Sequence, residues 1–360
     1  MINHHGDTND VISFTTTSND LSAGLEKYAI CVAERFWLTA LSAEEAKAQL
    51  HSRSDSILCL TVDDETATSD LISCPNKLGH IFQFSKLILP RPTNTFVVCI
   101  NPGARSLTNA ALLLGGYLLI CEKMGLDRIA DAFNDVSSHF LTFLDAEGGD
   151  NVELTVFDCW AALQRATALG WLDFSDEPSE DAIDMDECLH YDSVANGGLH
   201  VVVPNKLLAF PPPTDIGDGC AWVDEGGARR FSPSYYADVL GDFDVAVAVS
   251  CAGAGSAASY DAAAMEDRGI AVEVLAADAR SGRLLASVDR VLTLARAAPG
   301  AMALHGAGGW EEGLLLSAYL IRMHGFSARH AIAWARMTHP RAPVPAPRLA
   351  LHCFDSSRAD

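Results

Sequence analysis

The feature that most constrains the fold is a unit of strand, glycine-rich loop and helix that occurs twice in the chain. The second copy runs from the apolar stretch Ala301–His305 through the loop Gly306–Gly309 to a helix expected from Leu314. The first copy spans Phe96–Ile120. Backbone N–H groups converge where such a loop enters a helix, and they form a cradle for an anion. Two copies of this unit predict two related domains.

The second half of the chain alternates between short strands and helices. We expect an α/β fold of two tandem domains, each a central, mostly parallel sheet flanked by helices, because strands alternate with helices of suitable length. The expected strands are 56–62, 95–100, 200–203, 206–210, 243–250, 270–275 and 301–305, and the expected helices are 107–122, 126–140, 152–169, 257–268 and 283–297, with others starting at Ser232-Pro233, Leu314 and Ala328.

Composition shifts along the chain predict its division into domains. Residues 1–22 are polar and are expected to form a flexible arm. Residues 23–172 are expected to form the N-terminal domain and residues 198–355 the C-terminal one. Between them, residues 173–197 are acidic and are expected to contain a linker helix.

Charge and cysteine usage exclude several classes of function. The formal net charge of −22 argues against a nucleic-acid partner, since phosphate backbones attract Lys and Arg. None of the ten cysteines forms a Cys-x-x-Cys pair, so we expect neither a metal site nor a cofactor. The start of the chain lacks the regions of a signal peptide, and its longest apolar stretch, Ala110–Cys121, is too short for a membrane span. We therefore expect a soluble, cytoplasmic protein without membrane contact.

Four segments carry a resemblance to one known family. They are Asn109–Tyr117, Asp184–Gly197, Val203–Phe210 and Ala328–Pro340. Through these segments the chain resembles the tandem-domain dual-specificity protein phosphatases of the mitotic-exit, cell-division-cycle-fourteen type, over residues 28–351. Asp184–Gly197 resembles the linker helix of that family, and Asn109–Tyr117 resembles a helix of its N-terminal domain. Val203–Phe210 resembles the start of its catalytic domain, and Ala328–Pro340 resembles the helix after its catalytic loop.

The resemblance implies that catalysis has been lost from the C-terminal domain. In the family a Cys thiolate attacks phosphorus, an Arg clamps the phosphoryl oxygens, and an Asp protonates the leaving oxygen. Here the Cys position holds His305 or Gly306, and the Arg position holds Glu311 or Glu312. Only the acid has a counterpart, Asp278. We expect a pseudophosphatase, and we do not expect His305 to act as a nucleophile, because no cationic clamp would stabilise its transition state.

A second loop, in the N-terminal domain, fits the phosphatase pattern Cys-x5-Arg-Ser. It contains Cys99, Arg105 and Ser106, and Asp70 is the candidate acid. In the family, the corresponding domain is regarded as noncatalytic. Pro102 has no backbone N–H, so the loop has one hydrogen-bond donor fewer. Val98 precedes the Cys in place of the His that lowers the thiol pKa in the family. We expect Cys99 to be a core thiol, and activity through this loop is the alternative hypothesis.

The resemblance also suggests a partner. Family members bind peptides with a basic residue in an acidic groove between the domains, and Asp184, Asp186 and Glu187 on the linker helix are the candidate residues for it here. A solvated helix face is the simpler interpretation of these carboxylates. We expect a scaffold that binds a basic protein segment or joins a cytoskeletal assembly, because the family is associated with spindle, centrosome and cilium. A phosphopeptide trap is the weakest hypothesis, since the glutamates leave no cation for phosphate.

Overall fold

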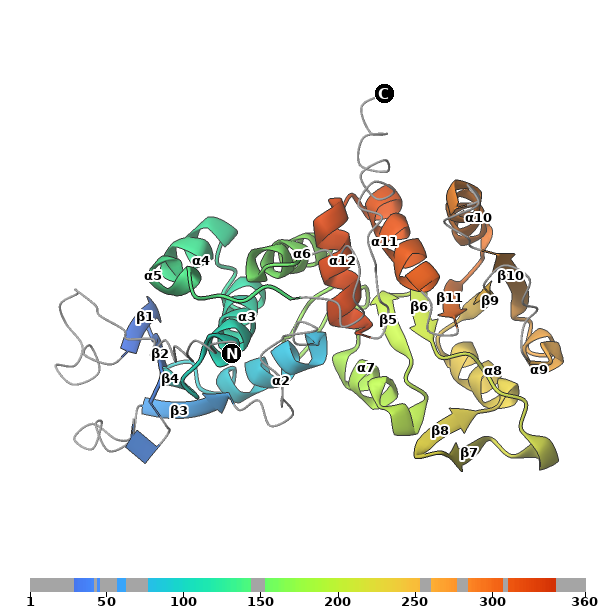
Figure 1. Cartoon of the computed structure of the whole chain (residues 1–360), viewed down its shortest axis with the longest axis horizontal. Helices are drawn as coiled ribbons and strands as arrows, with labels where there is room; N and C mark the ends of the chain where they lie inside the picture. Colours follow the sequence, from blue (N-terminus) through green and yellow to red (C-terminus); the bar gives the residue numbers. More distant parts are fainter. Residues whose placement is uncertain are drawn as a thin grey trace, which may run out of the picture.

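Two main β-sheets organise the chain, one in each half, and helices lie between them (Figure 1). The computed structural model describes residues 29–41, 44–45, 57–62, 77–143, 153–252, 260–276, 284–306 and 310–340. The expected arm, Asp70 and Asp278 lie outside these residues. Within them, no helix is both long and apolar enough to cross a membrane.

The N-terminal sheet has four strands in the order β1-β2-β4-β3. β1 and β2 are antiparallel, and the other pairs are parallel. The central strand β4 is buried because five of its six residues are apolar and lie between two covered faces. The bounds are β1 Ala29–Ala33, β2 Phe36–Thr39, β3 Ile57–Val62 and β4 Thr95–Ile100.

Five helices pack beside this sheet, and α3 is the most buried of them. Gly115 on α3 has no side chain, and the indole of Trp160 on α6 occupies that space; a Cβ at Gly115 would lie 2.3 Å from its Nε1. Thr155 caps α6 in a reciprocal pair with Asp158. The bounds are α2 Leu78–Ile88, α3 Ala104–Ile120, α4 Leu126–Ala132, α5 Asn134–Ser137 and α6 Val156–Ala168.

The C-terminal sheet has five strands in the order β10-β9-β11-β6-β5, all parallel except the β5–β6 pair. α10 and α11 lie on one side of it, and α8 and α9 lie on the other (Figure 1). The bounds are β5 His200–Val203, β6 Leu207–Phe210, β9 Val245–Ala252, β10 Ala271–Ala276, β11 Ala301–Gly306, α8 Pro233–Asp242, α9 Ala263–Glu266, α10 Leu284–Ala297, α11 Trp310–His324 and α12 Ala328–Thr338.

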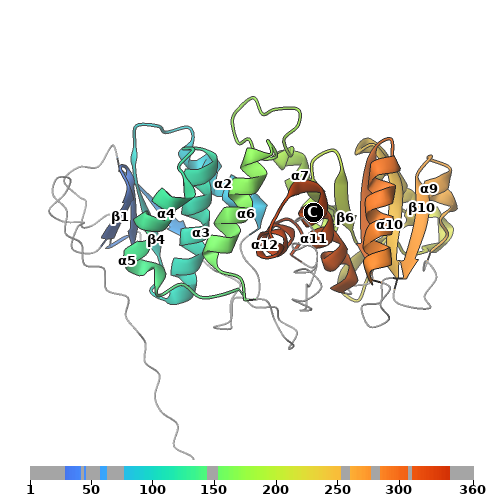
Figure 2. The same ribbon diagram turned by 90° about the horizontal axis from the view of Figure 1, so that it is seen from above.

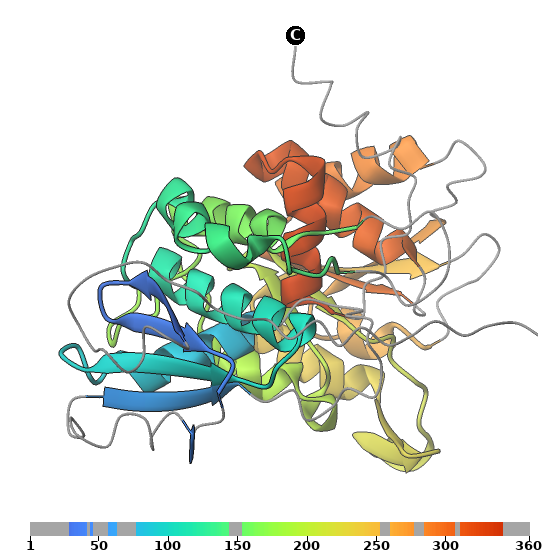
Figure 3. The same ribbon diagram turned by 60° about the vertical axis from the view of Figure 1, so that its left-hand side comes forward.

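A two-stranded hairpin stands apart from this sheet and protrudes from the C-terminal half (Figure 3). Its turn contains Gly226 and Gly227, both at positive φ, which suits a tight hairpin turn. The bounds are β7 Trp222–Glu225 and β8 Ala228–Phe231, and the 3-10 turns η2 Val194–Asn196 and η3 Gly217–Gly219 lie nearby in the chain.

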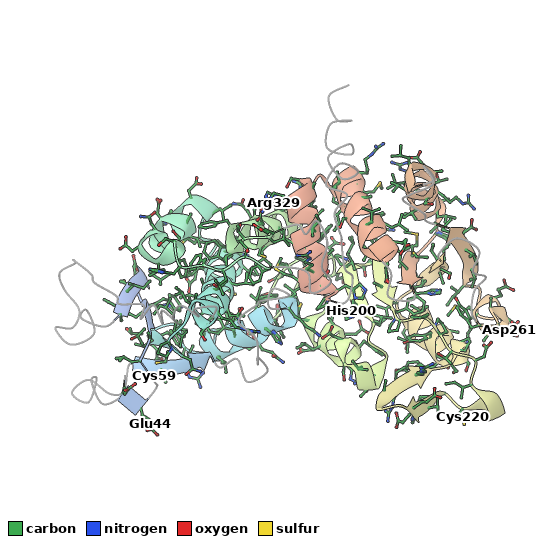
Figure 4. The ribbon with its side chains drawn as sticks, viewed as in Figure 1. Glu44, Cys59, His200, Cys220, Asp261 and Arg329 are labelled. Atoms are coloured by element: carbon green, nitrogen blue, oxygen red, sulfur yellow. The ribbon has the colours of Figure 1, made fainter. Side chains whose placement is uncertain are left out.

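The two halves meet along α6 and α12, with the linker helix α7, Met185–Asp192, beside α2 (Figures 1 and 2). Arg329 on α12, which Figure 4 labels, donates two hydrogen bonds of 2.8 and 2.7 Å to the carboxylate of Asp158 on α6. Trp171 stacks on Phe326, with ring centroids 5.7 Å apart. The described apolar core is therefore shared between the halves.

The expected architecture of two mostly parallel sheets flanked by helices is confirmed. The helix expected over 257–268 is shorter than predicted. Residues 263–266 form α9, and the described residues 260–262 on its N-terminal side are not helical. Another, 126–140, is divided into α4 and α5 at Phe133. The domain boundaries stay a prediction.

Candidate functional site

The C-terminal glycine-rich loop begins where β11 ends, at the carboxyl edge of the C-terminal sheet. Gly306 is the last residue of β11 and pairs with Cys251 of the neighbouring strand β9. α11 begins at Trp310, and residues 307–309 lie outside the described part of the chain. The carboxyl ends of parallel strands are where α/β sheets place their ligands, so side chains around Gly306 are the candidates for function.

His305 is a buried, neutral imidazole. Its side chain is 1% exposed, and its Nε2 lies 2.9 Å from the hydroxyl of Tyr260. The ring also packs on Phe210, with centroids 4.9 Å apart. Burial lowers the pKa of His305 from 6.5 to about 4, because the imidazolium would lose its hydration. The residue is therefore an uncharged part of the core near neutral pH.

Glu312 is the glutamate that faces the end of β11. Its side chain is buried, whereas Glu311 is half-buried. A Cβ added at Gly306 would lie 3.3 Å from Oε2 of Glu312 and 3.5 Å from the carbonyl oxygen of Cys251. A cysteine at position 306 would therefore point its first carbon at a carboxylate. Phosphate chemistry needs a cation at that place.

A cleft of about 260 Å³ opens beside this carboxylate, at the junction of the two halves. α2 contributes Lys77 to it, and the linker helix contributes Asp192. Figure 4 shows His200, another lining residue, at this junction. The full lining is Lys77, Asp192, Val194, Gly198, His200, Phe210, Pro211, Pro212, Gly306, Glu312, His339 and Pro340.

Polar contacts link the three parts of the chain across the cleft. Lys77 Nζ donates to Asp192 Oδ2 at 2.7 Å, and His200 Nδ1 lies 2.7 Å from Asp192 Oδ1. Burial raises the pKa of Asp192, but hydrogen bonds and charge from His200 and Lys77 outweigh it and lower that pKa to about 2. Burial lowers the pKa of His200 to about 4 despite its contact with Asp192. Asp192 is therefore ionised and paired with Lys77 near neutral pH.

The N-terminal loop differs from a phosphate cradle in the position of its cysteine. Cys99 lies inside β4, in register with Thr39 of β2 and Thr61 of β3, and it is 1% exposed. Its Sγ lies 3.7 Å from the carbonyl oxygen of Val97. The loop itself comprises residues 101–103, and α3 begins at the next residue. Arg105 and Ser106 lie half-buried in the first turn of that helix.

The chain is similar to known dual specificity phosphatases. Residues 30–166 match the family described as "Dual specificity protein phosphatase, N-terminal half". The human dual specificity protein phosphatase CDC14C is 29% identical over 244 residues, which cover 66% of this chain and 50% of that protein. The tyrosine-protein phosphatase CDC14 homolog of Schizosaccharomyces pombe is 25% identical over 331 residues, covering 88% of this chain and 59% of that one. The chain is thus similar to the CDC14 dual specificity phosphatases.

The similarity is limited in length and in depth. The CDC14-like chain spans about half the length of the human relative it matches. Among solved structures, the crystal structure of PTPMT1 is 16% identical, with 44% of this chain and 94% of that chain covered and a TM-score of 0.34.

The linker acids of this CDC14-like chain do not line the cleft. Asp184 caps α7 by accepting 3.0 Å hydrogen bonds from the backbone N–H groups of Asp186 and Glu187. All three side chains are exposed. The pKa of Glu187 is raised, first by the partial burial of its carboxylate and then by the negative charges of Asp184 and Asp242. The acidic side chain that α7 does contribute is Asp192, at its opposite end.

Sequence reasoning missed most of the cleft. Lys77 and His200 carry no motif, and Asp192 and His339 lie in segments whose only signal is their resemblance to helices of a known family. They meet because α2, α7, β5 and the end of α12 converge on one place. Among the described residues, no group of three or more His, Cys, Asp or Glu side chains is arranged to hold a metal ion.

Proposed function

We propose that this CDC14-like chain is a pseudophosphatase that works as a binding or structural scaffold. The observation that supports it most strongly is the position of the Glu312 carboxylate, 3.3 Å from where a side chain at Gly306 would begin. A phosphate dianion placed against the end of β11 would meet a negative charge in a buried setting. Two like charges 4 Å apart near a protein surface repel each other by about 4 kcal/mol.

The N-terminal loop is the less favoured route to catalysis. A nucleophilic thiolate must reach the phosphorus atom, and reactive cysteines lie in partly exposed, electropositive places. Cys99 is 1% exposed and is paired on both sides within the sheet. Its place favours the role of a core thiol.

The proposed partner is a protein rather than a nucleic acid or a membrane. The net charge of −22 favours basic segments by long-range attraction. The exposed carboxylates Asp184, Asp186 and Glu187 at the start of α7 are the proposed contact for such a segment. The family resemblance supports a place in a cytoskeletal assembly of the spindle, centrosome or cilium, in the cytoplasm.

The decisive experiment measures hydrolysis of p-nitrophenyl phosphate by the purified chain beside Cys99→Ser, with and without vanadate. We expect no turnover above that of the buffer in either protein. Turnover that vanadate inhibits and Cys99→Ser abolishes would move the active site to the N-terminal loop and refute the pseudophosphatase proposal. Ser is nearly isosteric with Cys, and circular dichroism of both proteins controls for folding.

A further inference from the structure

The strand β10 forms one edge of the C-terminal sheet, and it lacks the features that usually protect such an edge. Among the described residues no strand pairs with its outer side, because the strand order ends at β10. It holds six residues in unbroken parallel register with β9, and it contains neither Pro nor Lys. Native edge strands are usually short, bulged, charged or covered, because their unpaired N–H and C=O groups can bind another strand. The outer edge of β10 can therefore accept a further strand.

The opposite edge of the same sheet is protected. β5 has four residues, all of them buried, and its register with β6 shifts between Val201 and Val203. The helices α7 and α12 pack against it. Trp334 of α12 also donates a hydrogen bond of 2.9 Å to the carbonyl oxygen of Val202. The fold therefore closes one edge of this sheet and leaves the other unpaired among the described residues.

The surface of β10 is apolar and locally neutral. Val274 is 45% exposed. Glu273 is the only charged residue of the strand, and its Oε1 lies 3.0 Å from Nε and 2.9 Å from Nη2 of Arg290 on α10. The whole chain carries a net charge of −22, so two copies repel each other over most of their surface. A contact between copies needs a place where the charge is neutralised, and the Glu273–Arg290 pair provides it.

The strand is also complementary to itself in antiparallel pairing. With Val274 on a two-fold axis, this valine lies beside its own equivalent, and Glu273 lies opposite Leu275 of the second copy. Carboxylates directly opposite each other would destabilise the pair, and this register avoids them. β10 and α9 lie at the end of the chain's long axis that is remote from the N-terminal sheet (Figures 1 and 2). The N-terminal halves of the two copies therefore stay apart.

We propose that the outer edge of β10 is an interaction surface for a second copy of this chain, whose β10 pairs with it antiparallel about a two-fold axis at Val274. Two five-stranded sheets then become one sheet of ten strands. The pairing uses the open edge of both copies, so the assembly closes at a dimer. No residue of the C-terminal glycine-rich loop takes part, so this inference is independent of the pseudophosphatase proposal.

The dimer is expected to be weak. Two strands of six residues, with the neighbouring parts of α9 and α10, bury less surface than the about 1,200–2,000 Å² of a stable complex. We therefore expect a Kd on the order of 10 µM. Sedimentation velocity of the full chain at concentrations from about 2 to about 200 µM covers this value.

The first test compares two lysine substitutions by this method. Val274→Lys places a charge opposite its own equivalent, and it should weaken the dimer at least about tenfold. Val223→Lys is the matched control, because Val223 is also an exposed valine on a strand and the change in net charge is the same. This control should dimerise like the wild type. Circular dichroism of all three proteins checks their folding.

Three results would overturn the proposal. A wild-type chain that stays monomeric over the whole concentration range would refute self-pairing. A dimer of equal strength in Val274→Lys would place the contact elsewhere and refute the β10 surface. Species larger than a dimer that grow with concentration would contradict the closed two-fold arrangement.

The second test examines the register by cysteine cross-linking with diamide, an oxidant that takes one hydrogen from each of two thiols as they form a disulfide. Val274→Cys places a thiol beside its equivalent, where the Cα atoms lie within the about 4.4–6.8 Å that a disulfide spans. Val272→Cys places a thiol about 13 Å along the strand from its equivalent. We expect a cross-linked dimer on a nonreducing gel for Val274→Cys alone, above the background of the wild-type cysteines. Equal cross-linking of Val272→Cys would refute the register and the proposal with it.

Discussion

His305 offers the sharpest physical test of the site at the end of β11, because its charge state follows from its burial. The imidazole is 1% exposed, and its folded pKa is about 4, against 6.5 for an unperturbed histidine. Below pH 6.5 the unfolded chain therefore binds a proton that the folded chain rejects. The stability that His305 contributes is complete above pH 6.5, and it is lost as the pH falls from 6.5 towards 4.

The magnitude follows from the two pKa values. The full pKa shift of His305 corresponds to a loss of ~3 kcal/mol in the free energy of unfolding, which is reached at pH values below the folded pKa. Between about pH 7 and about pH 5.5 the proton-linkage relation gives a loss of ~1 kcal/mol from this one group. Burial lowers the pKa of His200 and His324 to about 4 as well, so the whole chain should lose more than His305 alone explains.

The perturbation is His305→Gln, whose amide reaches the position of Nε2 and does not titrate. Urea unfolding followed by tryptophan fluorescence at about pH 7 and about pH 5.5 should show a pH-dependent loss smaller than wild type by ~1 kcal/mol. Tyr260→Phe is the control, because it removes the hydrogen bond while His305 stays buried and titrates. An unchanged pH dependence in His305→Gln would refute the conclusion that His305 is held neutral.

Two other substitutions test the junction and the loop. Arg329→Ala removes both hydrogen-bond donors from Asp158. Because the Arg329 side chain is 42% exposed, we expect urea titration to show a loss of about 1–2 kcal/mol in the free energy of unfolding. Arg329→Lys should restore about half of that loss. Gly306→Cys places a thiol beside the Glu312 carboxylate. We expect this variant not to hydrolyse p-nitrophenyl phosphate, because the negative charge disfavours both the thiolate and the bound phosphate. Measurable turnover would contradict the role proposed for Glu312.

Local patterns predicted most of the elements that position the site. The strand 95–100 was predicted with its correct bounds, and Ser232 caps α8 as expected because its hydroxyl can accept the N–H of Tyr235. β1 and β2 were missed, and so was α2, although the apolar residues of 78–88 recur at helical spacing. The β7–β8 hairpin was missed despite the Gly226-Gly227 pair between its strands.

The sequence by itself determined the alternation of strands and helices, the two glycine-rich loops, and which residues stand in the C-terminal loop. These depend on residue identity and short-range spacing, which the chain carries in order. Tertiary structure alone decided that Glu312 rather than Glu311 faces Gly306, and that Cys99 pairs with Thr39 of β2 and Thr61 of β3. It also brought Lys77 to Asp192, which lies on another helix far along the chain. Such meetings arise from long-range packing of apolar faces, and no local pattern encodes them.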